Sequence, residues 1–220
     1  MLNKGILFGL VVLSLSSQCW SRGFYAGLGV GPEYADFKQG AHVVHPTDVD
    51  VKDTTHLSAT GVFGSIFAGY RWNNKRYYLA GEVAGNASSA EFSSSNYEYV
   101  HKSFTNTAYK IDNSFSVSVL PGLVLNATTF FYTRVGYITG NFKTHTQDTS
   151  LANVDKYLSG FLIGFGVQND ISEKLAVRFE YSQANYQKTA FNVLDGTTTK
   201  VTNISPQTGK MEFGFVYKFA

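Results

Sequence analysis

The strand-like segment at residues 210–219 reads KMEFGFVYKF and alternates strictly between two kinds of side chain. The large apolar or aromatic side chains stand at every second position: Met211, Phe213, Phe215, Tyr217 and Phe219. Successive side chains of a β-strand point to opposite faces, so the pattern predicts one apolar face and one face that carries Lys210, Glu212 and Lys218. A strand of about ten residues is long enough to cross a bilayer at a tilt.

Seven other segments of the chain alternate in the same way. Together they predict eight strands, at about residues 24–34, 60–72, 77–88, 114–125, 130–142, 158–168, 175–186 and 210–219. The short connections between them are turns at residues 73–76, 126–129 and 169–174. The long, polar connections lie near residues 35–59, 89–113, 143–157 and 187–209. Because short and long connections alternate along the chain, we predict an all-β fold, an eight-stranded antiparallel up-and-down transmembrane β-barrel with long extracellular loops.

The face opposite the apolar one carries the charged side chains of the predicted strands. A charge against lipid at the middle of a bilayer costs about 2–4 kcal/mol, which favours an inward position. The strand charges that can be placed on this face are Glu33, Arg71, Glu82, Arg134, Arg178, Glu180, Lys210, Glu212 and Lys218. We interpret them as a structural network that closes the lumen, since eight strands enclose a space that side chains can fill. The alternative is a charged lining of a selective pore.

Some of these inward charges are expected to meet as pairs. Glu33 and Lys210 lie near the outer ends of the first and last strands, which are neighbours in a closed barrel. The charges of residues 178–180 are expected to reach toward Glu212 or Lys218. Breaking one buried pair would leave an uncompensated charge, at a cost of about 3–5 kcal/mol.

A soluble eight-stranded carrier barrel is the structural alternative, because it shows the same alternation with its two faces exchanged. The strand glycines help to decide between the two. Those that share a face with the charges are Gly27, Gly29, Gly31, Gly160, Gly164 and Gly166. Small residues suit a crowded lumen, which favours charges inside and apolar side chains toward lipid.

Composition supports one β-rich domain. The chain has 220 residues, only 15% charged and 15% aromatic, with 21 glycines. This composition argues against a disordered chain and against a helical bundle. The net charge is +2 without a basic block, so we expect no nucleic-acid partner. We also expect a monomer.

The first 21 residues have the pattern of an export signal. Lys4 precedes an apolar run at residues 6–15, which is too short to span a bilayer as a helix. Small residues near position 21 predict cleavage after Ser21, which leaves residues 22–220 as one outer-membrane β-barrel domain. A lipoprotein signal that uses the single cysteine, Cys19, is the alternative. Either way the remaining chain has no cysteine pair for a disulfide.

Several short motifs resemble one known family. They are the C-terminal EFGFVYKF of residues 212–219, AGYRW of residues 68–72, AGEV of residues 80–83, YTRVGY of residues 132–137 and RFEY of residues 178–181. The chain is similar in these motifs to the small outer-membrane β-barrel domain family, which includes OmpA-, OmpX- and opacity-antigen-like barrels. The resemblance covers the whole chain after the signal and implies an eight-stranded barrel in the outer membrane of a Gram-negative bacterium. It implies no single activity.

The C-terminal motif also implies a partner. In the family, alternate aromatic residues that end in a terminal Phe form the strand recognised by the barrel-assembly machinery. The matching residues here are Phe213, Phe215, Tyr217 and Phe219. Ala220 follows the last Phe and departs from the family pattern.

Metal and cofactor sites are not predicted. The five histidines are His42, His45, His56, His101 and His145, and all fall in the long loops of the predicted fold. His42 and His45 with Asp48, Asp50 and Asp53 offer imidazole and carboxylate groups for a divalent metal. The spacing matches no metal-binding motif, so we interpret these residues as part of a solvated loop and expect no metal and no cofactor.

Function is expected in the outer loops, because binding residues concentrate on loops that a rigid scaffold presents. Their Ser, Asn and Tyr residues, for example in SSSNYEY at residues 93–99, suit adaptable recognition. We therefore predict a non-enzymatic surface antigen or adhesin, with a purely structural role in the envelope as an alternative. Its partners would be outer-membrane lipid or lipopolysaccharide and a host or envelope ligand. The alternatives are a small porin or hydrophobic-solute channel, and a lipid-modifying enzyme in which His101 or His145 folds over the barrel rim.

Overall fold

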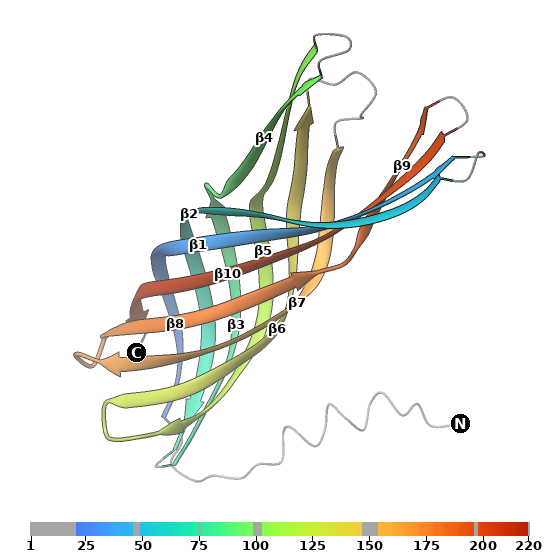
Figure 1. The fold of residues 1–220 in the computed structure, drawn as a ribbon. Coiled ribbons are helices and arrows are strands. Elements are labelled where there is room, and N and C mark those ends of the chain that lie inside the picture. The colour runs from blue at the N-terminus through green and yellow to red at the C-terminus, as the bar shows by residue number, and fades with distance from the viewer. Residues whose placement is uncertain are drawn as a thin grey trace, which may run out of the picture.

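The computed structural model describes residues 21–45, 49–74, 76–98, 103–146, 154–195 and 198–219, which form a β-sheet structure (Figure 1). Its strands are β1 (Ser21–His45), β2 (Val49–Asn73), β3 (Tyr77–Ser88), β4 (Glu91–Glu98), β5 (Ser103–Val124), β6 (Thr129–Thr146), β7 (Val154–Asp170), β8 (Leu175–Tyr186), β9 (Thr189–Asp195) and β10 (Thr198–Lys218). No helix among the described residues is long and apolar enough to cross a membrane.

Eight of these strands close into an antiparallel barrel, as the sequence predicts. The order around the ring is β1-β2-β3-β5-β6-β7-β8-β10, and β10 pairs back with β1. The closing register places Tyr25 opposite Lys218 and Glu33 opposite Lys210. β4 and β9 lie outside the ring, because β4 pairs with β5 and β9 pairs with β10.

The four long connections lie where the sequence predicts them, but most of each consists of β-strand, because the barrel strands continue into them. β1 and β2 have 25 residues each, and β1 and β10 stay paired as far as Val44 and Thr199. Beyond the bilayer a strand can be solvated on both faces, so its side chains need not alternate and the period-two signal disappears. This also corrects the placement of the histidines: His42, His45, His56 and His145 lie on strands, and His101 falls outside the described residues.

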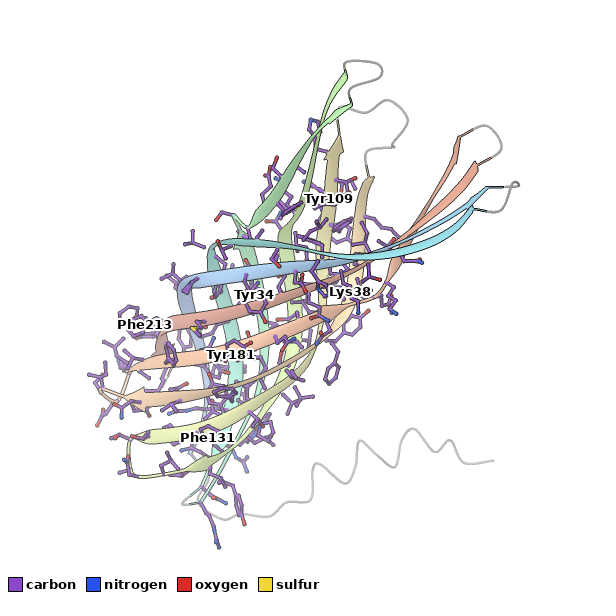
Figure 2. All side chains as sticks on the ribbon, in the orientation of Figure 1. Tyr34, Lys38, Tyr109, Phe131, Tyr181 and Phe213 are labelled. Atoms are coloured by element: carbon purple, nitrogen blue, oxygen red, sulfur yellow. The ribbon has the colours of Figure 1, made fainter. Side chains whose placement is uncertain are left out.

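The prolonged strands form two sheets beyond the barrel, and we call this side of the molecule the extended end. One sheet, sheet A, consists of the outer parts of β2, β1, β10 and β9. The other, sheet B, consists of β4 and the outer parts of β5, β6 and β7. Figure 1 shows that the two sheets rise from the barrel and then diverge. Figure 2 shows Lys38 on sheet A and Tyr109 on sheet B.

The opposite side, the turn end, has three short connections that are built alike. Asn74 Oδ1 accepts hydrogen bonds from the backbone N–H groups of Arg76 and Tyr77, at 2.8 and 2.7 Å. Asn126 does the same for the second and third residues after it, and so does the Ser172 hydroxyl. Asn and Ser favour such turns because their short side chains can bond the backbone two residues on.

The inside of the barrel is packed with two apolar clusters, one toward each end. The cluster toward the turn end contains buried residues such as Tyr78, Phe130 and Tyr132. The cluster toward the extended end contains Phe37 and Phe142 among its buried residues. The outer surface of the barrel is apolar as well: Leu28, Val30, Val62, Ile66, Phe115, Val117, Phe161, Phe165, Phe213 and Phe215 are all exposed there. An apolar belt on the outside of a closed barrel is the surface that lipid requires.

Candidate functional site

A chain of five charged side chains crosses the lumen between the two apolar clusters. It runs from Glu180 to Arg134, Glu82, Arg178 and Glu212, with acid and base alternating. The N–O distances along this chain are 2.7, 2.7, 2.7 and 2.6 Å. Each guanidinium group therefore bridges two carboxylates, which is the geometry that makes buried ion pairs strong.

Neutral donors add one hydrogen bond to each carboxylate of this chain. The Tyr25 hydroxyl donates to Glu82 at 2.8 Å, and the Tyr132 hydroxyl donates to Glu180 at 2.7 Å. The Ser65 hydroxyl donates to Glu212 at 2.6 Å. These three residues were not predicted as part of the site, because nothing in the alternation distinguishes an inward Tyr or Ser that holds a carboxylate from one that only packs.

Small and aromatic residues shape the space around the Arg178–Glu212 pair. The Arg178 guanidinium carbon lies 3.6 Å from the centre of the Phe67 ring, a cation–π contact that adds to its ion pairs. A Cβ at Gly29 would come within 2.5 Å of both the Glu212 carboxyl carbon and the Ser65 hydroxyl. The absence of a side chain at Gly29 therefore makes room for the Ser65–Glu212 hydrogen bond.

A separate ion pair lies toward the extended end. Lys210 Nζ is 3.4 Å from a Glu33 carboxylate oxygen, and both side chains are buried. The same ammonium lies 5.0 Å from the centre of the Phe63 ring. This is the contact expected where the first and last strands meet.

A third group of charges closes the turn end, and its central residue is Asp170. Lys218 Nζ is 2.7 Å and Arg71 Nη1 is 3.4 Å from the Asp170 carboxylate. Arg71 therefore pairs with Asp170, while Glu82, which flanks the same turn as Arg71, pairs with Arg134 and Arg178. The sequence predicts Asp170 in a turn, but in the structure it is the last residue of β7. With Asp170 included, these lumen ion pairs contain five acids and five bases and carry no net charge.

The free space inside this network is small. A cavity of about 30 Å³ lies beside the charged chain and is lined by residues that include Ser116, Thr208 and Lys210. That volume holds on the order of two water molecules. The buried Thr208 hydroxyl, which lines this cavity, makes no hydrogen bond to the described residues, so it suits bound water. Side chains thus fill the lumen, as geometry predicts for eight strands.

The predicted assembly-signal residues lie on the outer face of β10 and at Phe219, which directly follows it. Phe213, Phe215, Tyr217 and Phe219 are all exposed, and their rings stack edge to face in two pairs with centroids 5.2 Å apart. Their position gives them no contact with the lumen network. Recognition by the assembly machinery remains a prediction.

Sheet B carries a second concavity, on its outer face. Its volume is about 470 Å³, and its charged lining includes Lys110, Lys143 and Asp155. Lys143 Nζ lies 3.0 Å from Asp112, and this ammonium donates the hydrogen bond that lowers the pKa of the Asp112 carboxyl below its usual range. Acids therefore already balance the lysines here.

Metal-ligand geometry is absent from the described part of the chain, where no group of three or more His, Cys, Asp or Glu residues could hold an ion. Asp48 falls outside the described residues, and the side chains of His42, His45, Asp50 and Asp53 are not described either. His56 contacts a single carboxylate: its Nδ1 lies 3.2 Å from Asp36 on the exposed face of sheet A.

The closed ring, the apolar outer belt and the paired charges inside define a small outer-membrane-type β-barrel whose lumen is packed. The sequence identifies the family. Residues 6–219 match the outer membrane protein beta-barrel domain, and the chain belongs to this family. In such barrels the short turns face the periplasm and the long connections face outward, so the extended end is the extracellular one.

Comparison of structures finds similarity to outer-membrane proteins that are distant in sequence. Neisserial surface protein A is 15% identical, with 92% of this chain and 100% of that chain covered and a TM-score of 0.46. The attachment invasion locus protein Ail of Yersinia pestis, in complex with a heparin analogue, is 14% identical, with 90% and 99% covered and a TM-score of 0.37. The outer membrane protease OmpT from Escherichia coli is 8% identical, with 90% and 97% covered and a TM-score of 0.48. No curated protein matches the chain.

Proposed function

We propose that this protein is a non-enzymatic surface protein of the outer membrane that binds a host or envelope partner through its extracellular sheets. The observation that carries the proposal is the contrast between the two parts of the molecule. The lumen holds a cavity of only about 30 Å³, whereas β1 and β2 continue well past the barrel as part of sheet A. Closing a barrel needs no such extensions, and binding residues are usually found on the connecting segments that a rigid scaffold presents.

The chemistry of the inward charges supports the same reading. Carboxylates that each accept from two or more donors, such as Glu82 and Glu180, are fully engaged in holding the barrel together. A catalytic acid or base must be within reach of a substrate, and a nucleophile needs a base beside it. The lumen of the described residues offers no room for a substrate next to these groups.

The proposal includes how the chain reaches its place. Residues 1–21 act as the export signal, residues 22–220 form the barrel domain, and the protein works as a monomer in contact with lipopolysaccharide. The aromatic outer face of β10 serves as the signal for the assembly machinery.

Shortening each extracellular hairpin in turn tests the binding role. The pairing registers give the cuts: a two-residue Asn-Gly turn replaces residues 40–54, 96–105, 145–153 or 191–202 and keeps the flanking strands paired. Heat-modifiable gel mobility shows whether each barrel still folds. We expect at least one variant to lose binding to host cells, to serum proteins or to isolated envelope components.

Two results would contradict the proposal. If all four folded variants bind as the parent does while the lipid A composition of the cells changes, the protein is an enzyme. If neither binding nor lipid A changes, the protein is a structural element of the envelope.

A further inference from the structure

The ladder between β2 and β3 ends at a defined point, Val62. The Ser89 N–H donates to the Val62 carbonyl oxygen at 3.0 Å, and the Val62 N–H donates to the Ser89 hydroxyl at 3.0 Å. Ser89 thus occupies both backbone groups of Val62 that point away from β1. Beyond this point the described part of β2 has a strand partner on its β1 side only.

After Ser89 the chain stops pairing with β2 and crosses it at Gly61. A Cβ at Gly61 would lie 2.6 Å from the Ala90 backbone nitrogen and 2.7 Å from the Ala90 Cα. Glycine at position 61 permits this close approach, after which β4 continues in sheet B. β2 continues in sheet A, and Figure 1 shows the two strands separating.

The geometry of a strand then identifies the backbone groups that are left open. The N–H and C=O of one residue point to the same side, and every second residue repeats that direction. Since the groups of Val62 point away from β1, those of Thr60, Ser58, His56 and Thr54 do so as well. Residues 54–60 therefore present a row of unpaired donors and acceptors over about 20 Å.

The side chains on this edge leave the row accessible. Asp36 on β1 accepts a hydrogen bond from the Ser58 hydroxyl at 3.3 Å and lies 3.2 Å from the His56 ring nitrogen. These contacts draw both side chains toward β1 and away from the open edge. No lysine or glutamate stands in residues 54–60, although natural edge strands usually carry such charges to prevent pairing with other chains.

In the described part of the chain, three other strands at the extended end also pair on one side only: β4 with β5, β9 with β10, and the outer part of β7 with β6. The edge of β7 is guarded by charges. β7 has a strand partner on its β6 side only over residues 154–158, and the exposed charges Asp155 and Lys156 stand within this short stretch. Residues 54–60 of β2 form a longer stretch that is uncharged except for His56, which is held by Asp36, whereas Asp50, Lys52 and Asp53 stand on the outermost part of the same strand.

We propose that residues 54–60 of β2 are a docking edge for an extended peptide segment of the partner, which adds to sheet A as one more strand. The inference rests on the proposed binding function and names the kind of ligand. The inner side of this edge adjoins the apolar cluster of the extended end, where Leu57, Phe92 and Tyr109 are only partly buried. The fitting peptide is therefore uncharged and alternates apolar with small polar residues, its apolar side facing this cluster.

Amide exchange measured on the labelled protein in nanodiscs tests the edge directly. The probe is a seven-residue peptide of alternating threonine and valine, and the control probe is the same peptide with its pairing amides N-methylated. Binding should slow exchange about tenfold or more at Thr54, His56, Ser58 and Thr60. The alternate residues Thr55, Leu57 and Ala59 already donate toward β1 and should not change. Equal effects of the two peptides, or no alternation, would overturn the proposal.

A proline variant links the edge to the partner. Ser58→Pro removes an N–H that β1 does not use, and proline is tolerated on edge strands, so the barrel should fold. It should abolish both peptide protection and partner binding, whereas Ser58→Ala keeps the N–H and should retain both. If shortened hairpins lose partner binding but Ser58→Pro retains it, the edge proposal is wrong while the binding function stands. If neither change affects binding, both are wrong.

Discussion

Glu82 is the residue on which the lumen network depends most. Its two oxygens accept from two different guanidinium groups, those of Arg134 and Arg178, each at 2.7 Å, and one of them also accepts from Tyr25. Without this carboxylate, two buried cations would face each other with one acid fewer between them. Removing one partner of a buried ion pair is costly because the charge that remains is uncompensated.

We expect Glu82→Gln to lower the free energy of unfolding by about 3–5 kcal/mol. Urea unfolding of the barrel in detergent micelles measures this as a lower midpoint with an unchanged slope. Asp112→Asn is the matched control, because Asp112 also pairs with a cation, Lys143, but on the partly exposed sheet B. Solvent screens that pair, so its shift should be much smaller. Equal shifts for the two variants would show that the lumen network does not stabilise the barrel.

Sequence reasoning could find most of the charged network but not its full set of partners. Glu82, Arg134 and Glu212 stand out because a charge on an alternating strand is destabilising on the lipid face and must point into the lumen. Asp170 does not stand out, because it adjoins a turn, and acidic residues are common in turns. Tyr25 does not either, because its hydroxyl reaches a residue 57 positions away and only the closed ring brings the two together.

The turn-end connections act as elements in their own right, because one side chain organises each of them. In the second turn, Asn126 Oδ1 accepts from Thr128 N at 2.9 Å and from Thr129 N at 2.8 Å. The backbone N–H groups at a tight turn have few other partners, so the side chain substitutes for a missing strand.

Asn126→Ala should therefore destabilise the barrel by about 0.5–2 kcal/mol, the range for losing a side-chain acceptor that caps backbone N–H groups. Asn126→Asp keeps an acceptor oxygen at the same place and should cost much less. Urea unfolding of the two variants under identical conditions makes the comparison. If the Asp variant loses as much as the Ala variant, the hydrogen bonds to the turn backbone are not what stabilises it.

The sequence pattern predicts strand number in the barrel better than strand length. Within the bilayer each strand has one face in lipid and one in the lumen, so residues such as those at 161–167 alternate and mark the strand clearly. Beyond the bilayer that constraint ends: Thr54 and His56 are exposed polar residues on a regular strand, and their sequence reads as a loop. β4 and β9 were missed for the same reason.

At the scale of the whole molecule, the lumen is sealed by layers of different chemistry. From the turn end they are the Asp170 group, an apolar cluster with Tyr132, the Glu82 chain, the Lys210–Glu33 pair and a second apolar cluster with Phe37. An ion that entered would have to displace apolar side chains and separate paired charges in turn. Each step is unfavourable because the charges already satisfy one another.

Purified protein in a planar lipid bilayer should therefore show no steady ion conductance. A stricter test removes one layer: Phe37→Ala with Phe142→Ala opens the outer apolar cluster, in which the two ring centres are 5.9 Å apart. Because the Lys210–Glu33 pair, the Glu82 chain and the turn-end cluster remain closed beneath it, this double variant should also stay silent, although its unfolding midpoint should fall. Stable, ion-selective currents from the parent protein would show that the lumen is a channel, and currents from the double variant alone would show that the outer cluster is the sole barrier.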